Sequence, residues 1–208
     1  MEKGNTKQEI LEMALDMFSV KGYEATSISQ IAEAVGIRKA SMYSHFASKQ
    51  EILDALVQEL LKEYDKHSIF ARANWDDPAF TEDKQDMTPD IAVQMIRGHV
   101  RYILHDRRIS RARKMLTIEQ FQNPQLAKLQ TKQNYTDVLH YFTGFIRFLI
   151  RQGKLTDKEP EIMAAQFCFP VSAWINLCDR EPEREDEAMV LIERHVRQFF
   201  KMYGTSNL

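Results

Sequence analysis

The chain has 208 residues, of which 44% are hydrophobic and 28% are charged, a mixture typical of a globular protein and not of a disordered one. Its net charge of −2 indicates no global affinity for nucleic acid, so any such binding must come from a local surface. The two cysteines match no disulfide framework and no metal-binding spacing. No apolar stretch predicts a signal peptide or a membrane span, and we expect a cytoplasmic protein without metal or cofactor.

Apolar residues recur with a period near 3.6, and with only seven Gly and six Pro the sequence is expected to be all-α. Helix-capping residues and prolines divide it into about nine helices. A polar, acidic segment, Ala73–Met87, has no period and is expected to be a loop. The predicted helices are Thr6–Val20, Ile28–Val35, Lys39–Phe46, one starting after Ser48, Pro89–Asp106, Ile109–Phe121, Pro124–Gln152, Lys158–Arg180 and Pro182–Tyr203.

Two short helices near the N-terminus have the sequence features of a helix-turn-helix, at residues 27–46. Ser27 stands three residues before Gln30, the spacing of a capping box that fixes a helix start. Ser48 and Glu51 repeat this spacing at the start of the fourth helix. Between the short helices, Gly36 lies in an apolar turn and can adopt a positive φ. A motif of this size can place its second helix in a major groove.

Positive charge is concentrated around the second short helix. From residue 34 to residue 50 there is no Asp or Glu, whereas Arg38, Lys39 and Lys49 are basic and His45 can add to them. A basic surface of this kind attracts phosphates. A basic helix near an acidic one is usually just a solvated face, so charge alone does not favour DNA binding and the order of residues has to decide.

The order of residues resembles that of the TetR/AcrR family of transcription regulators. The matching positions are Phe18, Gly22, Thr26, Ser27, Ile31, Ala32, Val35, Gly36, Ile37, Met42, Tyr43, His45, Phe46, Ser48, Lys49, Ile52 and Leu53. The resemblance implies an N-terminal three-helix DNA-binding domain, residues 1–53, followed by a C-terminal helical bundle, residues 54–208, that dimerises and senses a ligand.

The resemblance also implies roles for individual residues of the head. Phosphates of double-stranded DNA would be contacted by Ser27, Tyr43 and Lys49. Met42 and Phe46 would hold the recognition helix inward. The residues facing the bases would be Lys39, Ala40, Ser41, Ser44 and His45, with Arg38 at the edge.

The last two helices are expected to form a homodimer interface, over about residues 158–203. Ile162–Cys178 is apolar on nearly every side, so one chain of this size cannot cover all of it. Members of the family dimerise through their last two helices, and a two-fold dimer would read a palindromic operator.

The family also implies a small-molecule effector, bound among the middle helices. Most bulky residues there would serve the core alone. Glu119 could pair with a cationic ligand or with a nearby arginine, and we favour the arginine. The candidate ligand-binding residues are Met95, His99, Tyr102, Met115, Ile118, Glu119, Phe121, Tyr135, Phe142, Phe145, Phe167 and Trp174.

A second basic segment, Arg97–Lys114, has seven Lys or Arg residues. It could bind nucleic acid, but we favour a solvated edge balanced by the acids of Asp76–Asp90.

No enzyme is expected, because the six histidines are scattered and no phosphate loop, nucleophile elbow or paired metal motif occurs. The predicted function is a repressor released from DNA by a small molecule. The alternatives are a DNA-binding dimer controlled by a protein partner and, less favoured, a helical-bundle enzyme.

Overall fold

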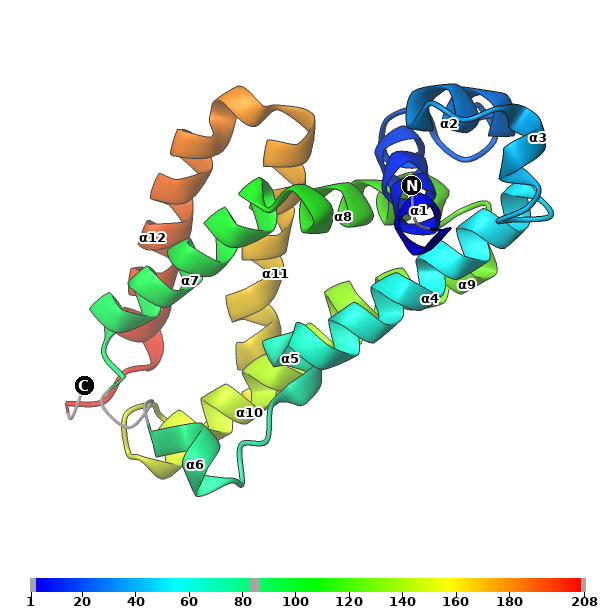
Figure 1. Ribbon diagram of the computed structural model, residues 1–208. Coiled ribbons are helices and arrows are strands. Elements are labelled where there is room, and N and C mark those ends of the chain that lie inside the picture. Colours follow the sequence, from blue (N-terminus) through cyan, green and yellow to red (C-terminus); the bar gives the residue numbers. More distant parts are fainter. Residues whose placement is uncertain (1–2, 83–86, 207–208) are drawn as a thin grey trace. The chain divides into compact units, whose positions relative to one another are not determined.

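The computed structural model describes residues 3–82 and 87–206. Within these ranges the chain is helical apart from turns, loops and one isolated bridge, between Leu155 and Gly204, and this confirms the all-α prediction (Figure 1). No helix in the described ranges is long and apolar enough to cross a membrane. The chain forms two compact units, the first of residues 1–68 and 107–131 and the second of residues 69–106 and 132–208. The domain boundary at residue 53 that the resemblance implies differs from this division and stays a prediction.

The first unit contains the predicted helix-turn-helix and a later helical segment that packs with it. Ile10, Ala14 and Phe18 lie on one face of its first helix and are fully buried, as the periodicity predicts. Met115 and Leu116, from the later segment, belong to the same hydrophobic core. The helices of this unit are α1 (Lys3–Lys21), α2 (Ile28–Val35), α3 (Lys39–Met42), α4 (Lys49–His67), α8 (Arg107–Glu119) and α9 (Pro124–Thr131).

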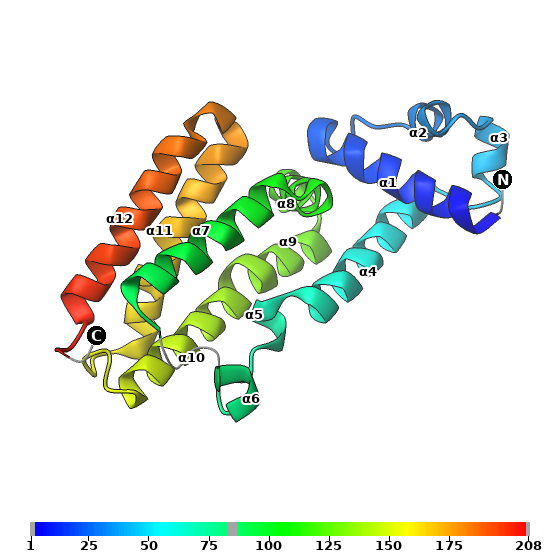
Figure 2. The same cartoon turned by 60° about the vertical axis from the view of Figure 1, so that its left-hand side comes forward.

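The second unit is a helical bundle in which α10 packs on α11, α11 on α12 and α12 on α7 (Figure 2). Its α-helices are α5 (Ile69–Arg72), α6 (Pro78–Thr81), α7 (Pro89–His105), α10 (Asp137–Arg151), α11 (Pro160–Arg180) and α12 (Glu185–Tyr203). A π-helical turn, Lys132–Thr136, precedes α10, and a 3-10 turn, Pro182–Arg184, precedes α12.

An aromatic cluster around Trp75 fills the core of the second unit. The indole ring makes edge contacts with Phe80 and Tyr141, with centroids 5.2 Å and 5.1 Å away. It also lies directly over Gly144 of α10, where an added Cβ would be 2.1 Å from an indole carbon. Gly144 is therefore the position that allows the ring to reach the helix backbone.

The observed helices differ from the predicted ones where a tight or wide turn replaces the regular α-helix. The recognition helix was expected to reach Phe46 but ends at Met42, and tighter turns then bring the N–H groups of His45 and Phe46 to the Met42 carbonyl. The predicted helix Pro124–Gln152 is interrupted by the π-helical turn. Apolar periodicity detects neither change.

The predicted loop, Ala73–Met87, contains a helix of only four residues, α6. Asp77 caps this helix by accepting a hydrogen bond from the Ala79 N–H, and Pro78 is its first residue. The helix is too short for its periodicity to be visible in the sequence. Residues 83–86 of the predicted loop lie outside the described residues.

Candidate nucleic-acid interface and ligand cavity

The helix-turn-helix is fixed by the local signals that the sequence carries. The Ser27 side chain accepts a hydrogen bond from the Gln30 N–H, and the Gln30 side chain accepts one from the Ser27 N–H, which confirms the predicted capping box. Gly36 ends α2 with a φ of 77°, and its N–H bonds carbonyls of the last turn. These contacts set the angle at which α3 follows α2.

Burial separates the two sides of α3 and of the turns that follow it. Met42 and Phe46 are 0% and 2% exposed and anchor the segment in the core of the first unit, as expected. The opposite side is exposed, and we call it the α3 surface: Arg38, Lys39, Ala40, Ser41, Tyr43 and Ser44. Of the other predicted DNA-contacting residues, Ser27 is exposed, and His45 and Lys49 are half-buried. The α3 surface thus presents two cations, a phenol and small side chains together.

Lys49 contacts the turn between α1 and α2, which the sequence did not predict. Its ammonium donates a hydrogen bond to the Tyr23 carbonyl at 2.8 Å and lies 4.0 Å from the centroid of the Tyr23 ring. At the same helix start, Ser48 accepts a hydrogen bond from the Glu51 N–H, as the capping-box spacing predicted. The Glu51 carboxylate accepts from the N–H of Ala47 instead of completing the box at Ser48.

Glu119 contacts the same turn from α8. Its carboxylate oxygen Oε1 accepts a hydrogen bond from the Tyr23 N–H at 2.7 Å, and the residue is 6% exposed. Glu119 therefore pairs with the backbone N–H of Tyr23 and not with the arginine that was expected. No signal within either segment could have revealed this contact, because the two residues are 96 positions apart.

The arginines that begin α8 bind acidic residues of α1 and α4. Arg108 forms ion pairs with Glu59, Glu63 and Glu12, with its Nη2 2.6 Å from Glu59 and its Nε 2.9 Å from Glu63. Burial lowers the pKa of its guanidinium below the usual range. Arg107 and Arg111 both bind Asp16. The prediction that the acids of Asp76–Asp90 balance this segment was therefore wrong for these arginines.

The second unit contains a cavity of about 240 Å³. Five predicted ligand-binding residues line it: Met95, His99, Phe142, Phe145 and Phe167. Six further lining residues were not predicted: Ile69, Phe70, Met87, Ala92, Ile96 and Tyr141. Ile69 and Phe70 directly follow α4, and Met87 directly precedes the cap of α7, so these three escaped a search confined to the predicted middle helices.

His99 is the one histidine of the cavity wall. Its Nε2 is buried, and no protein group in the described ranges forms a hydrogen bond with it. The imidazole packs edge-on against Phe70, with centroids 4.9 Å apart. Burial among apolar side chains lowers its pKa from 6.5 to about 4, so the ring is neutral at pH 7.

The other seven ligand candidates do not line this cavity. Met115 and Glu119 are buried in the first unit, and Trp174 packs against His195 with ring centroids 5.5 Å apart. The remaining four are exposed: Tyr102, Ile118, Phe121 and Tyr135.

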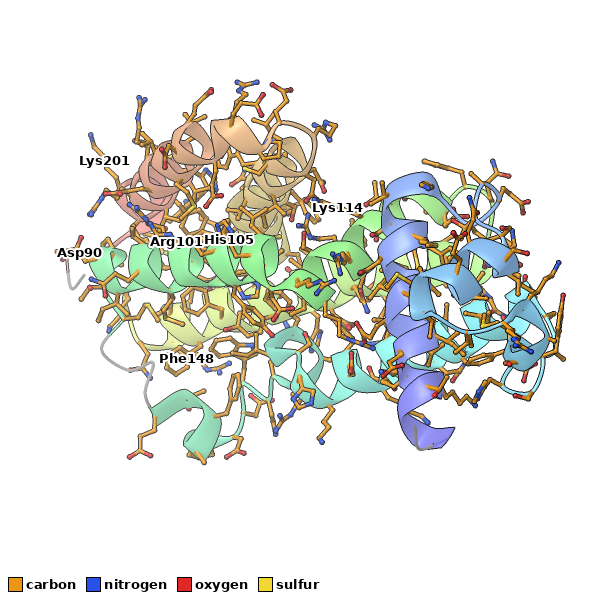
Figure 3. The ribbon with its side chains drawn as sticks, turned by 45° about the horizontal axis from the view of Figure 1, so that its top comes forward. Asp90, Arg101, His105, Lys114, Phe148 and Lys201 are labelled. Carbon is orange, nitrogen blue, oxygen red and sulfur yellow. The ribbon has the colours of Figure 1, made fainter. Side chains whose placement is uncertain are left out.

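A second hollow, of about 450 Å³, lies along α7 and α12. Figure 3 labels Asp90, Arg101 and His105 along α7, and the first two of these line the hollow. Its remaining charged residues pair with one another or with Asp90: Arg97 binds Glu193 at 2.7 Å, and Arg197 binds Asp90 at 2.7 Å. This charged groove contrasts with the apolar cavity.

Comparison with known proteins identifies the helix-turn-helix. Residues 10–56 match the family model described as "Bacterial regulatory proteins, tetR family". The HTH-type transcriptional repressor KstR2 of Mycobacterium tuberculosis is 45% identical over 53 residues, which are 26% of this chain and 26% of that protein. Residues 10–56 therefore form a TetR-family helix-turn-helix segment. The sequence match to this relative thus spans about a quarter of its length.

The fold of the chain is shared over nearly its whole length with solved structures. A TetR family transcriptional regulator from Pseudomonas syringae pv. tomato str. DC3000 aligns with a TM-score of 0.63 at 18% identity, over 98% of this chain and 99% of that one. SmeT of Stenotrophomonas maltophilia in complex with triclosan aligns with a TM-score of 0.62 at 19% identity, over 97% and 93% of the two chains. At 18–19% sequence identity, the similarity to these structures shows a shared fold alone.

Proposed function

We propose that the protein is a homodimeric transcriptional repressor that binds a palindromic operator through the α3 surface and is released by a small molecule bound in the second unit. The α3 surface is the observation that carries the proposal. Met42 and Phe46 bury one side of the segment and leave the cations and the phenol exposed on the other.

The chemistry of the α3 surface suits a DNA groove. Lys39 can donate to the acceptors of guanine, and the methyl group of Ala40 can contact a thymine methyl. Tyr43 is 50% exposed, which leaves its phenol accessible to a phosphate. Because the sequence has no acidic residue from position 34 to position 50, no carboxylate of this stretch would repel the phosphates.

Exposed apolar side chains on the last two helices support a homodimer. Ile162 on α11 is 53% exposed, and Val190 and Met202 on α12 are 56% and 61% exposed. A second copy would cover this surface around a two-fold axis. The two recognition helices would then read half-sites about one helical turn, roughly 34–36 Å, apart, so the proposed operator is palindromic.

The cavity is the proposed effector site. The chain leaves α4 at His67 and reaches Ile69 and Phe70, which line the cavity, within three residues. A ligand held there would bias the end of α4, the helix that starts at the DNA-binding head. To move the protein from about 1:99 to 99:1 between two states, the ligand must favour one state by roughly 5.5 kcal/mol. The triclosan complex of SmeT supports small-molecule binding within this fold.

The experiment is a genomic selection of DNA fragments on the full-length protein, followed by affinity measurements on the selected duplex at several salt concentrations. Lys39→Ala should weaken binding to the selected sequence, whereas Lys62→Ala removes the same charge from an exposed site on α4 and should not. A monomeric protein that selects no fragment, even at low salt, would contradict the proposal.

A further inference from the structure

The wall of the cavity in the second unit is mostly apolar. Among the residues that the structure describes, its lining contains no Lys, Arg, Asp or Glu, and its polar side chains are those of His99 and Tyr141. A charged ligand would lose its hydration there without meeting an opposite charge, and such a transfer is strongly unfavourable. The wall therefore selects for an uncharged ligand.

Size and shape limit the ligand further. A cavity of about 150 Å³ accepts benzene, and pockets for drug-sized molecules begin at about 300 Å³. The volume of about 240 Å³ lies between these values and suits one or two rings. Phe70, Phe142 and Phe145 offer ring faces and edges to a flat molecule. Ile69 and Met95 are 39% and 42% exposed, so they lie at the mouth.

His99 adds one polar requirement. Its Nε2 is buried at the cavity wall, and within the described residues no protein group bonds it. A neutral imidazole nitrogen is a donor in one tautomer and an acceptor in the other. A hydroxyl group can accept or donate, so it complements either tautomer. A water molecule bound to this nitrogen would find few other partners in an apolar wall, and a hydroxyl carried by a ring does not have this disadvantage.

We infer that the effector is an uncharged molecule of one or two rings, phenolic or alicyclic, with one hydroxyl that forms a hydrogen bond with Nε2 of His99. This inference rests on the proposed function of the cavity as the effector site. His99 then acts as the residue that distinguishes a hydroxylated ring from the plain hydrocarbon.

The test compares three probes of one ring system on the full-length protein: 2-naphthol, naphthalene and 2-naphthoate. A neutral hydrogen bond corresponds to a roughly 3- to 10-fold gain in affinity, so 2-naphthol should bind that much more tightly than naphthalene. The carboxylate should bind more weakly than either. Calorimetry or ligand-induced thermal shift measures all three.

Matched variants assign the preference to His99. His99→Phe keeps an aromatic ring and should bind naphthalene and 2-naphthol within about 2-fold of each other. His105→Phe makes the same change on the same helix at an exposed position outside the cavity and should keep the preference. A preference that survives in His99→Phe, or equal affinities in the unaltered protein, would overturn the inference.

Nitrogen NMR of the labelled histidines gives a readout that does not depend on a variant. 2-Naphthol should shift the Nε2 resonance of His99, whereas naphthalene should shift it much less. No change at this nitrogen on saturation with 2-naphthol rejects the inference. These measurements use no DNA and are independent of the operator selection. If the protein prefers 2-naphthol over naphthalene but selects no operator, the proposed repressor function is refuted and the inference about the cavity is not.

Discussion

The carboxylate of Glu119 accepts a hydrogen bond from the backbone N–H of Tyr23, with 2.7 Å between Oε1 and N. The carbonyl of the same Tyr23 accepts a hydrogen bond from the ammonium of Lys49. The backbone of Tyr23 therefore joins the end of α8, the turn after α1 and the start of α4 within the first unit. The turn between α1 and α2 is thus held from both sides by side chains distant in sequence.

Replacement of Glu119 should destabilise the first unit. Glu119→Ala removes a buried, charge-assisted acceptor and leaves the Tyr23 N–H without its partner, so the free energy of unfolding should fall by about 1.5–3 kcal/mol. Glu119→Gln retains an amide oxygen in the same place and should lose less. Urea denaturation measures the difference, and Glu24→Ala, at an exposed neighbouring site, is the control. Equal stability of the Glu119→Ala and Glu24→Ala proteins would show that the contact contributes nothing.

Gly22 follows α1 and Gly36 follows α2, and alanine substitutions at these two glycines can be compared directly. Both have positive φ, 81° and 77°, so an alanine at either position should cost about 1–2 kcal/mol of backbone strain. At Gly22 the added Cβ would also approach the Glu119 carboxylate to 3.1 Å, whereas at Gly36 it would meet nothing within 4 Å. Gly22→Ala should therefore lower the midpoint of thermal unfolding further than Gly36→Ala. If Gly36→Ala lowered the midpoint further than Gly22→Ala, the turn that contains Gly22 would be free to move away from Glu119.

Gly144 and Gly98 test packing within regular helices of the second unit. Gly144→Ala places a Cβ 2.1 Å from the indole of Trp75, and the forced repacking should destabilise by about 1–3 kcal/mol. At Gly98 the added Cβ meets nothing within 4 Å, so Gly98→Ala should stabilise α7 by roughly 0.5–1 kcal/mol. Chemical denaturation of both variants would reveal the opposite signs, and two changes of the same sign would contradict the close approach of Trp75.

The sequence predicted those features whose causes lie within a few residues. The cap at Ser27, the positive φ of Gly36 and the helix starts at Pro89 and Pro124 all depend on local chemistry, and all are present. The resemblance to the TetR/AcrR family also pointed to the inward side chains Met42 and Phe46, which are buried.

Contacts between distant segments were not predictable in this way. Periodicity shows that Met115 faces a core, but it cannot show that this core belongs to the first unit. Three lining residues, Ile69, Phe70 and Met87, lie outside the middle helices on which ligand-binding residues were expected, so the cavity could be assigned only in part. The partners of Glu119 and Arg108 depend in the same way on tertiary packing.

The pKa of His99 predicts how stability depends on pH. The folded protein holds this pKa at about 4, below the unperturbed value of 6.5, because burial disfavours the charged ring. Below pH 6.5 the unfolded chain therefore binds a proton that the folded protein excludes, and stability falls as the pH is lowered towards 4. This group should account for up to about 3 kcal/mol of that loss. Urea denaturation between about pH 7 and pH 4.5 should show a shallower decline for His99→Phe, with His140→Phe, at an exposed position of α10, as the control. Parallel curves for all three proteins would mean that His99 titrates normally.

Lys49 is predicted to combine a structural contact with a phosphate contact in the proposed DNA complex. An ammonium has three N–H donors, and the Tyr23 carbonyl accepts from one of them, which leaves donors for DNA. Lys49→Ala should weaken binding about equally for all duplexes and reduce the slope of log affinity against log salt by roughly two for a dimer. The lost bond to Tyr23 should also lower the free energy of unfolding by about 0.5–1.5 kcal/mol. Lys62→Ala should change neither quantity. A destabilised Lys49→Ala protein whose salt slope is unchanged would show that this lysine supports the turn and makes no phosphate contact.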